Sequence, residues 1–184
     1  MTISEDTVAA TRGAEGASED YAQKIKSTYT IFDNIKYWTE PFIQPIQGRI
    51  STEFGLYRYT NNSTTPTRHT GVDIAAAEGT NVPASNAGRV VFAGEVIITG
   101  NSVVIEHGGG LKTYYVHLSA INVKEGDIVE QGDIIGKVGS TGYATGPHLH
   151  FEVKLGEYPL SPWPLIDGSS SIYKDPAEML AQAE

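Results

Sequence analysis

Polar and apolar side chains alternate in the stretch GPHLHFEVK, residues 146–154. In a β-strand, side chains two residues apart point to the same face of the sheet. The pattern therefore predicts a strand with an apolar face and a polar face. The apolar face carries Leu149, Phe151 and Val153, and the polar face carries His148, His150 and Glu152. Two imidazoles on one face indicate a metal site, although a pair of surface histidines on a sheet gives the same pattern.

The chain around this stretch has the composition of a series of short strands. From Ile46 onward, runs rich in Val, Ile, Phe and Tyr are separated by Gly, Pro, Asn and Asp, which is typical of strands joined by turns. We predict further strands over residues 89–93, 102–106, 112–117 and 134–138. The middle of the chain is therefore predicted to be all-β.

Two segments of the chain resemble each other and predict a duplicated unit. EGTNV at 78–82 leads into GRV at 88–90, and EGDIV at 125–129 leads into GKV at 136–138. Each copy has the order turn, strand, turn, strand that is found in small sandwiches and barrels. The second copy alone would also suit a biotinyl or lipoyl carrier domain. Such a domain needs an exposed lysine at a hairpin tip, however, and Lys137 lies inside an apolar strand.

A second motif, HTGVD at residues 69–73, supplies further metal-ligand types. His69 and Asp73 lie four residues apart across a glycine. Imidazole and carboxylate suit a borderline cation such as zinc, and the chain has no cysteine to supply a thiolate. Together with one histidine of the 148–150 pair they would give three protein ligands, which leaves a fourth position for water as in catalytic zinc sites. The alternative is that Asp73 caps a turn and His69 is merely exposed.

Other chemistries that use the same residue types lack their motifs. No His-Glu-x-x-His string of a zincin helix occurs. Glu152 lies only two residues past His150, whereas the strand motif of a cupin needs a glutamate three or four residues past its second histidine. The string GSTG at 139–142 lacks the frame of a hydrolase nucleophile elbow. The triple glycine at 108–110 leads into a predicted strand and not into the helix that a phosphate loop needs.

The segments on either side of the β region are predicted to contain tails and helices. Residues 1–19 are acidic and poor in large apolar side chains, which predicts a disordered tail. Apolar residues then recur at helical spacing, which predicts a helix over about 20–38, within an N-terminal helix and linker of residues 20–45. This helix would pack on its own domain, connect to an upstream segment or cover an active site as a pro-segment. Residues 167–184 are predicted to be a C-terminal tail with a short helix near the end.

The charge of the chain argues against nucleic acid as a partner. The 184 residues include 13 Lys and Arg and 22 Asp and Glu, for a net charge of −9, and so acidic a chain is unsuited to neutralising a phosphate backbone. Residues 49–166 hold only 8 basic and 11 acidic side chains, so most of the negative excess belongs to the flanks. No apolar run has the length of a membrane helix, and the first 20 residues lack the pattern of a signal peptide.

Taken together, the motifs resemble those of the lysostaphin-type (LytM-like) zinc metallo-endopeptidases, which are peptidoglycan hydrolases. The matching strings occur in the order of that family and span about residues 46–166: ISTEFG at 50–55, HTGVD at 69–73, NSVVIEHG at 101–108, TYYVHL at 113–118, GSTG at 139–142 and GPHLHFE at 146–152. The resemblance implies a mainly β fold, a small antiparallel sandwich or barrel-like domain with a duplicated hybrid motif and a groove. This agrees with the two similar segments.

The resemblance also implies a role for each histidine. It implies that one zinc ion is bound by His69, Asp73 and His150. It also implies two catalytic imidazoles, those of His117 and His148. We expect His148 to be the base and His117 to stabilise the oxyanion, and we expect His107 to be a structural turn residue. Because the set is complete, the resemblance implies an active enzyme and not a degenerate member of the family.

The function implied by the resemblance is zinc-dependent hydrolysis of a peptide bond in bacterial peptidoglycan, in a cross-bridge or a stem peptide. The expected location is outside the cytoplasm, in the cell wall or periplasm, and the expected state is a monomer. The alternative is a non-catalytic wall-binding or partner-binding module of the same fold in a division or sporulation complex. A zinc hydrolase of small molecules on the same site would need a closed pocket in place of an open groove.

Overall fold

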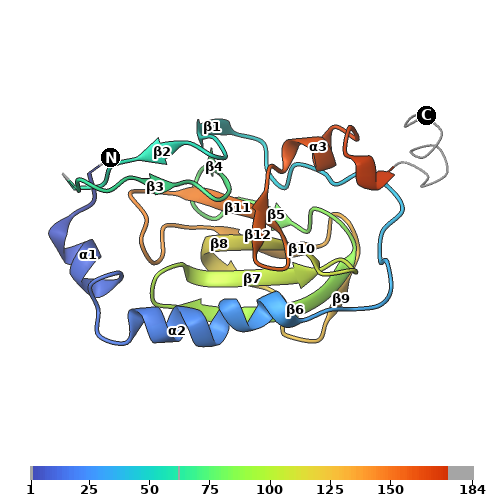
Figure 1. Ribbon diagram of the computed structural model, residues 1–184, viewed down its shortest axis with the longest axis horizontal. Helices are drawn as coiled ribbons and strands as arrows, with labels where there is room; N and C mark the ends of the chain where they lie inside the picture. The colour runs from blue at the N-terminus through green and yellow to red at the C-terminus, as the bar shows by residue number, and fades with distance from the viewer. Residues whose placement is uncertain (1, 62, 174–184) are drawn as a thin grey trace.

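The computed structural model describes residues 2–61 and 63–173, most of which lie in or beside one antiparallel sheet (Figure 1). The ten-stranded sheet has the order β1-β4-β11-β8-β7-β6-β9, while β10 pairs with β5 and β8, and β12 pairs with β11. Its strands are β1 (Arg49–Thr52), β4 (Val72–Ala75), β5 (Asn81–Pro83), β6 (Gly88–Val96), β7 (Gly100–Glu106), β8 (Leu111–Ile121), β9 (Ile128–Val129), β10 (Ile134–Val138), β11 (His148–Leu155) and β12 (Tyr158–Leu160). A separate two-stranded ribbon consists of β2 (Tyr57–Arg58) and β3 (Thr67–Arg68). The structure confirms the mainly β prediction and all five of the predicted strands.

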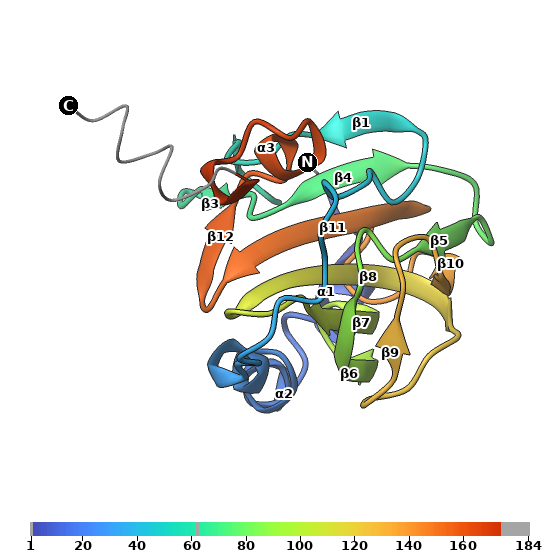
Figure 2. The ribbon, with the colours of Figure 1, turned by 90° about the vertical axis from the view of Figure 1, so that its right-hand side faces the viewer.

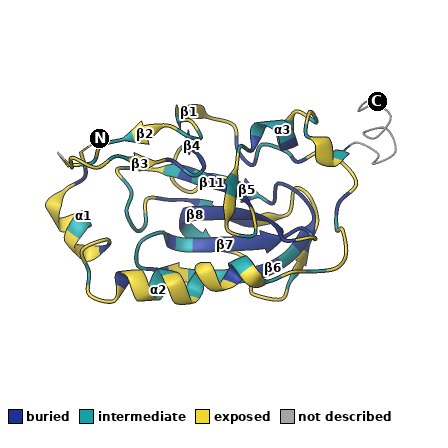
Figure 3. Ribbon diagram, viewed as in Figure 1, coloured by how far each residue is buried: buried dark blue, intermediate teal, exposed yellow. Residues whose placement is uncertain are grey.

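Strand β11 lies near the centre of the sheet, between β4 and β8 (Figure 2). Its apolar residues Leu149, Phe151 and Val153 are buried in the main hydrophobic core, as the alternation in the sequence predicts. Figure 3 shows that burial extends along β7 and β8, next to β11. The sheet thus fixes β11 on both sides, which holds its polar face in one position.

The two similar sequence segments form interlocked halves of the sheet. The short strand β5 of the first copy pairs with β10 of the second, and the short strand β9 of the second pairs with β6 of the first. Lys137 lies within β10, where it pairs with both Asn81 and Ala120, so it is not at a hairpin tip. This excludes the arrangement that a carrier domain would need.

The prediction of a disordered tail over residues 1–19 was wrong. The structure has the helix α1 (Glu5–Ala10) and the first residues of α2 (Ala17–Lys24) there. Ile3 is only 3% exposed, and its backbone N–H and C=O are both hydrogen-bonded to the side chain of Asn61 at 2.9 Å. These are tertiary contacts with residues far along the chain, so the composition of the segment does not indicate them.

The predicted helix over 20–38 is too long, because α2 ends at Lys24 and is followed by the short 3-10 helix η1 (Lys26–Thr30). Beyond it, buried charges bind the backbone in an extended form. Lys112 donates to the Ile31 carbonyl at 2.6 Å and is paired with the fully buried Glu106 at 2.8 Å. Phe32 and Ile35, which would lie on the apolar face of the predicted helix, are 62% and 58% exposed.

The domain extends beyond the predicted limits of 46–166. Trp38 and Phe42 belong to the main core, and Tyr173 packs against it. The C-terminal part of the described chain contains the short helices α3 (Trp163–Ile166) and η2 (Ser171–Tyr173). The helix predicted near the end of the chain lies outside the described residues. Among the residues that are described, no helix is long and apolar enough to cross a membrane.

His107 is a structural residue, as predicted. It follows β7 and is fully buried, its Nδ1 donates to the Ala87 carbonyl at 2.7 Å, and its Nε2 is hydrogen-bonded to the Thr113 hydroxyl at 2.7 Å. Burial lowers the pKa of His107 to about 4. The side chain is therefore neutral at pH 7.

This burial predicts an acid-sensitive contribution to stability. Because the pKa of His107 is lower in the folded protein than in the unfolded chain, the contribution is complete above pH 6.5 and is lost as the pH falls towards 4. A His107→Gln variant keeps a donor and an acceptor but does not titrate. Between pH 7 and 4, the free energy of unfolding measured in urea is expected to fall by about 3 kcal/mol more in the wild type than in this variant. Equal losses in the two proteins would contradict the prediction.

Candidate active site

Strands β4 and β11 bring the two histidine motifs together. In their antiparallel register His150 lies opposite Asp73, and His69 precedes β4 in the adjoining loop. The motif needs its glycine because a Cβ atom on Gly71 would lie 2.3 Å from the Phe151 carbonyl oxygen. The loop can therefore approach β11 closely enough for the His69 ring to reach the His150 ring, with 4.8 Å between their centroids.

Three side-chain atoms converge at this point, one each from His69, Asp73 and His150. The distance from His69 Nε2 to Asp73 Oδ1 is 3.0 Å, and that from His69 Nε2 to His150 Nδ1 is also 3.0 Å. His150 Nδ1 and Asp73 Oδ1 are 2.6 Å apart. The described residues contain this group as the one set of three that could hold a metal ion.

The outer nitrogen of each ring determines which tautomer the ring has. His69 Nδ1 donates to the Glu53 carbonyl at 2.9 Å, and His150 Nε2 donates to the Glu152 carboxylate at 3.0 Å. In the neutral form, His69 Nε2 and His150 Nδ1 are therefore left with lone pairs that face Asp73 Oδ1. Lone pairs from two nitrogens and one carboxylate oxygen fit a cation such as zinc, and outer partners of this kind are usual for metal-binding histidines.

Both carboxylates at the site, Asp73 and Glu152, are held in the ionised form. Burial alone would raise the pKa of Asp73, but hydrogen bonds to His150 and His69 hold it well below its usual range. Burial alone would lower the pKa of His150, but Asp73 and Glu152 raise it to about 9. A proton and a metal ion therefore compete for His150 Nδ1. Arg58 Nη2 donates to the other oxygen of Asp73 at 3.1 Å and fixes the carboxylate.

Glu152 connects the site to a buried charge network. Besides His150, it accepts a hydrogen bond from the Thr70 hydroxyl and pairs with Lys154 at 2.8 Å. Lys154 also donates to the Tyr29 hydroxyl at 3.1 Å. Burial would raise the pKa of Glu152, but Lys154 and His150 keep it well below its usual range. The sequence indicates that Glu152 lies on the histidine face, but it gives no sign of the Thr70, Lys154 or Arg58 contacts.

His117 and His148 lie beside the three converging atoms, with 4.9 Å between their ring centroids. Each donates from Nδ1 to a backbone carbonyl at 2.8 Å, His117 to Thr141 and His148 to Gly146. Both carbonyls belong to the loop between β10 and β11. Each ring therefore keeps a lone pair on Nε2 in its neutral form, and His148 Nε2 is 3.8 Å from Asp73 Oδ1.

Both rings are neutral at pH 7. Burial is the main cause, followed for His117 by the neighbouring imidazoles, and it lowers the pKa of His117 to about 3. Burial also lowers the pKa of His148. His117, within the buried part of β8, has a positive φ of 63°, which is unusual for a residue other than glycine. The structure therefore brings all five predicted site residues together and places two unprotonated bases beside the candidate metal ligands.

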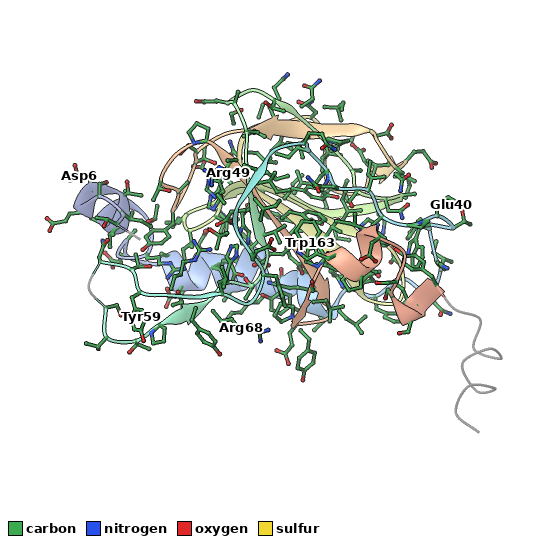
Figure 4. The ribbon with its side chains drawn as sticks, turned by 90° about the horizontal axis from the view of Figure 1, so that it is seen from above. Asp6, Glu40, Arg49, Tyr59, Arg68 and Trp163 are labelled. Atoms are coloured by element: carbon green, nitrogen blue, oxygen red, sulfur yellow. The ribbon has the colours of Figure 1, made fainter. Side chains whose placement is uncertain are left out.

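These side chains line a cavity of about 680 Å³. One wall is the β2–β3 ribbon, on which Arg68 is labelled in Figure 4. A second wall is formed by residues 143–147 of the loop between β10 and β11, and a further part of the lining comes from α2 and the residues on either side of it. The last of these walls depends on how the N-terminal segment packs, which the sequence leaves open among packing on its own domain, connection to an upstream segment and covering of an active site.

A model of peptidase family M23 matches residues 67–162, which include all five of these side chains. The chain belongs to peptidase family M23. This confirms the resemblance to the lysostaphin-type peptidases. The roles of the individual residues follow from chemistry and are proposed below.

Several of the relatives that the chain matches carry peptidase names. The DD-carboxypeptidase/endopeptidase Mpg of Neisseria meningitidis is 46% identical over 121 residues, which are 65% of this chain and 28% of the relative. The peptidoglycan DD-endopeptidase ShyA of Vibrio cholerae is 42% identical over 113 residues, 61% of this chain and 26% of the relative. The chain therefore matches less than a third of the length of either M23 relative.

Solved structures show the same fold. A zinc-containing peptidase from Vibrio cholerae aligns with a TM-score of 0.64 and 34% identity, covering 67% of this chain and 40% of that one. The catalytic domain of lysostaphin from Staphylococcus simulans aligns with a TM-score of 0.58 and 36% identity, covering 64% and 90%. The SpoIIQ–SpoIIIAH pore-forming complex contains a chain that aligns with a TM-score of 0.62 and 30% identity, covering 70% and 92%.

Proposed function

We propose that this M23 chain is a zinc-dependent endopeptidase that hydrolyses peptide bonds in bacterial peptidoglycan, outside the cytoplasm. The observation that carries the proposal is the convergence of His69 Nε2, Asp73 Oδ1 and His150 Nδ1 beside two neutral histidines. The peptidoglycan endopeptidase ShyA and the zinc-containing peptidase among its relatives support the substrate and the metal. The volume of the cavity would suit a peptide segment or a small molecule, and family membership favours the peptide.

The donor set determines what a metal could contribute. One zinc ion held by His69, Asp73 and His150 would lower the pKa of a water molecule in its fourth position and polarise the carbonyl of the scissile peptide. The chain itself then has to move protons. His148 Nε2 has a free lone pair, so His148 accepts the proton of the attacking water and delivers it to the amine nitrogen as the C–N bond breaks.

His117 has a different task in this proposal. Its Nδ1 hydrogen is already donated to the Thr141 carbonyl, so only a protonated His117 can donate from Nε2 to the developing oxyanion. Burial opposes that proton, whereas negative charge on the substrate oxygen favours it. We therefore assign His117 to stabilisation of the oxyanion and His148 to the role of base.

The alternative is a module that binds the cell wall or a protein partner without turnover. The alignment with a chain of the SpoIIQ–SpoIIIAH complex is the observation that favours it. The alternative gives no role to the unprotonated Nε2 atom of His148 or to the ring of His117 beside it. A partner-binding surface would be expected to tolerate their loss.

A single variant separates the two functions. His117→Asn removes the titratable ring, and asparagine is among the residues that best tolerate the left-handed backbone at this position. If the chain is an enzyme, zinc-loaded His117→Asn loses the release of new amine ends from purified sacculi, by about 100-fold or more, while it still sediments with them. If wild type and variant bind equally and neither releases amine ends, the module is the correct interpretation.

A further inference from the structure

The N-terminal segment, residues 2–30, packs on the same face of the sheet as the active site. Ile25 is buried against Val104 and Tyr114 on that face. Asp20 accepts a hydrogen bond from the Ile97 N–H at 2.8 Å, which holds α2 against the end of β6. Figure 1 shows α1 and α2 running along the side of the molecule from the β2–β3 ribbon to β6. Tyr21 and Ile25 consequently line the same cavity as the five site residues.

This segment contacts both walls of the cavity. At its beginning, Ile3 is hydrogen-bonded through its backbone to Asn61, next to the β2–β3 ribbon. Further along, the guanidinium of Arg12 lies over the ring of Tyr143, 4.4 Å from its centroid. Tyr143 belongs to the loop whose carbonyls hold His117 and His148. The segment therefore connects the two walls and places Arg12 beside the loop that positions both histidines.

The segment is a part of the cavity wall and does not fill the site. Within residues 2–61 and 63–173, no side chain from the N-terminal segment makes a hydrogen bond, ion pair or ring contact with any of the five site residues. The segment packs as a part of the domain, because its residues Ile3, Ile25 and Thr28 are all buried. Space for a substrate remains between Arg12 and the histidines.

The cavity gathers positive charge although the chain has a net charge of −9. Three arginines line it, namely Arg12, Arg58 and Arg68. The lining carboxylates are already engaged, Asp73 with Arg58 and the histidines, and Glu152 with Lys154. Within the described part of the chain, neither Arg12 nor Arg68 has a carboxylate partner. Guanidinium groups bind carboxylates with two parallel hydrogen bonds, so an anionic substrate group is the expected partner.

We propose that Arg12 binds a free carboxylate of the substrate peptide close to the scissile bond, and that the chain therefore prefers peptides with free carboxylates over their carboxamide forms. Arg12 is favoured over the other two arginines by its position. Arg58 is committed to Asp73. Arg12 and Arg68 each lie over an aromatic ring, but the ring under Arg12, that of Tyr143, belongs to the loop whose carbonyls hold His117 and His148, and the ring of Phe54 under Arg68 does not. The inference rests on the proposed endopeptidase function and adds a specificity residue from outside the matched peptidase region.

The test uses one peptidoglycan cross-link peptide in two forms, with its stem carboxylates free or converted to carboxamides. The kcat/KM ratio of the two forms is measured for the wild-type chain, Arg12→Gln and Arg12→Lys, with Arg49→Gln as the matched control. Arg49 is exposed on β1, is labelled in Figure 4 and does not line the cavity. Equilibrium binding of both forms is measured by calorimetry in parallel, because binding needs no cleavage.

The wild type and Arg49→Gln are expected to favour the free carboxylate by about tenfold in both kcat/KM and binding. The preference is expected to fall towards unity in Arg12→Gln and to be partly kept in Arg12→Lys, which retains the charge but not the planar fork. An unchanged preference in Arg12→Gln, or no preference in the wild type, overturns the inference. If neither peptide is cleaved but the Arg12-dependent binding preference is present, the endopeptidase proposal fails and the carboxylate site remains.

Discussion

Replacement of Asp73 by alanine is expected to lower the affinity for zinc by more than about 100-fold and to reduce peptide hydrolysis to background. Asp73 contributes the one negative charge among the three converging atoms, with its Oδ1 2.6 Å from His150 Nδ1 and 3.0 Å from His69 Nε2. Its removal also frees the guanidinium of Arg58 from the carboxylate, which adds repulsion towards a cation. The two remaining imidazoles are a much weaker site.

The measurement is the shift in melting temperature with added zinc. A ligand that binds only the folded state stabilises it in proportion to the logarithm of its concentration over Kd, so the wild type is expected to shift and Asp73→Ala is not. Asp33→Ala is the matched control, because Asp33 also pairs with an arginine, Arg89 at 2.6 Å, but lies outside the candidate metal group. A zinc-dependent shift in Asp73→Ala equal to that of the wild type would show that the metal binds elsewhere.

Replacement of His148 by alanine is expected to lower kcat by about 10² to 10⁴ while the affinity for zinc stays close to that of the wild type. His148 Nε2 is unprotonated at pH 7, because Nδ1 donates to Gly146 and burial lowers the pKa of the ring. It is 3.8 Å from Asp73 Oδ1, so it lies beside the candidate metal ligands and is not one of the three. The loss of a positioned base affects proton transfer and leaves the metal site complete.

The role of a base also predicts which kinetic constant changes. Because the base acts in the chemical step, kcat is expected to fall with little change in KM. Zinc content after dialysis, measured by atomic absorption, is expected to remain one per chain. A variant that keeps its zinc and also keeps kcat would refute the role of His148 as the base, whereas a variant that loses its zinc would make His148 a ligand.

Most of the candidate site could be predicted because its residues lie in short sequence motifs. The alternation around His148 and His150 indicates one shared polar face, and the register of β4 and β11 then places Asp73 opposite His150. The supporting contacts could not be predicted in this way. Arg58 reaches Asp73 from the β2–β3 ribbon and Lys154 reaches Tyr29 across 125 residues of sequence, and both depend on tertiary packing.

In the fold, too, the features that depend on local sequence could be predicted and those that depend on tertiary packing could not. Strands such as β7 and β8 were predicted correctly because long runs of β-branched and aromatic side chains are buried on both faces. The N-terminal region was predicted wrongly, because its conformation depends on contacts with residues far along the chain. The helix α2 ends at Lys24, although the helical spacing of apolar residues continues beyond it. After η1, Lys112 and Glu106 hydrogen-bond the backbone at residues 31 and 33 and hold it in an extended form. Asn61 orders Ile3 in a segment whose composition predicts disorder.

The most direct test of the central claim is digestion of purified sacculi in water enriched in ¹⁸O, with the released fragments analysed by mass spectrometry. Each bond that the zinc-loaded chain cleaves is expected to leave one new amine group on one product and one new carboxyl group on the other, and the new carboxyl group is expected to contain a single ¹⁸O atom, since hydrolysis takes one oxygen from water. Release is expected to stop when a chelator removes the metal and to resume when zinc is restored. Sacculi that stay intact at full zinc loading, although the chain binds them, would contradict the claim and favour a non-catalytic module.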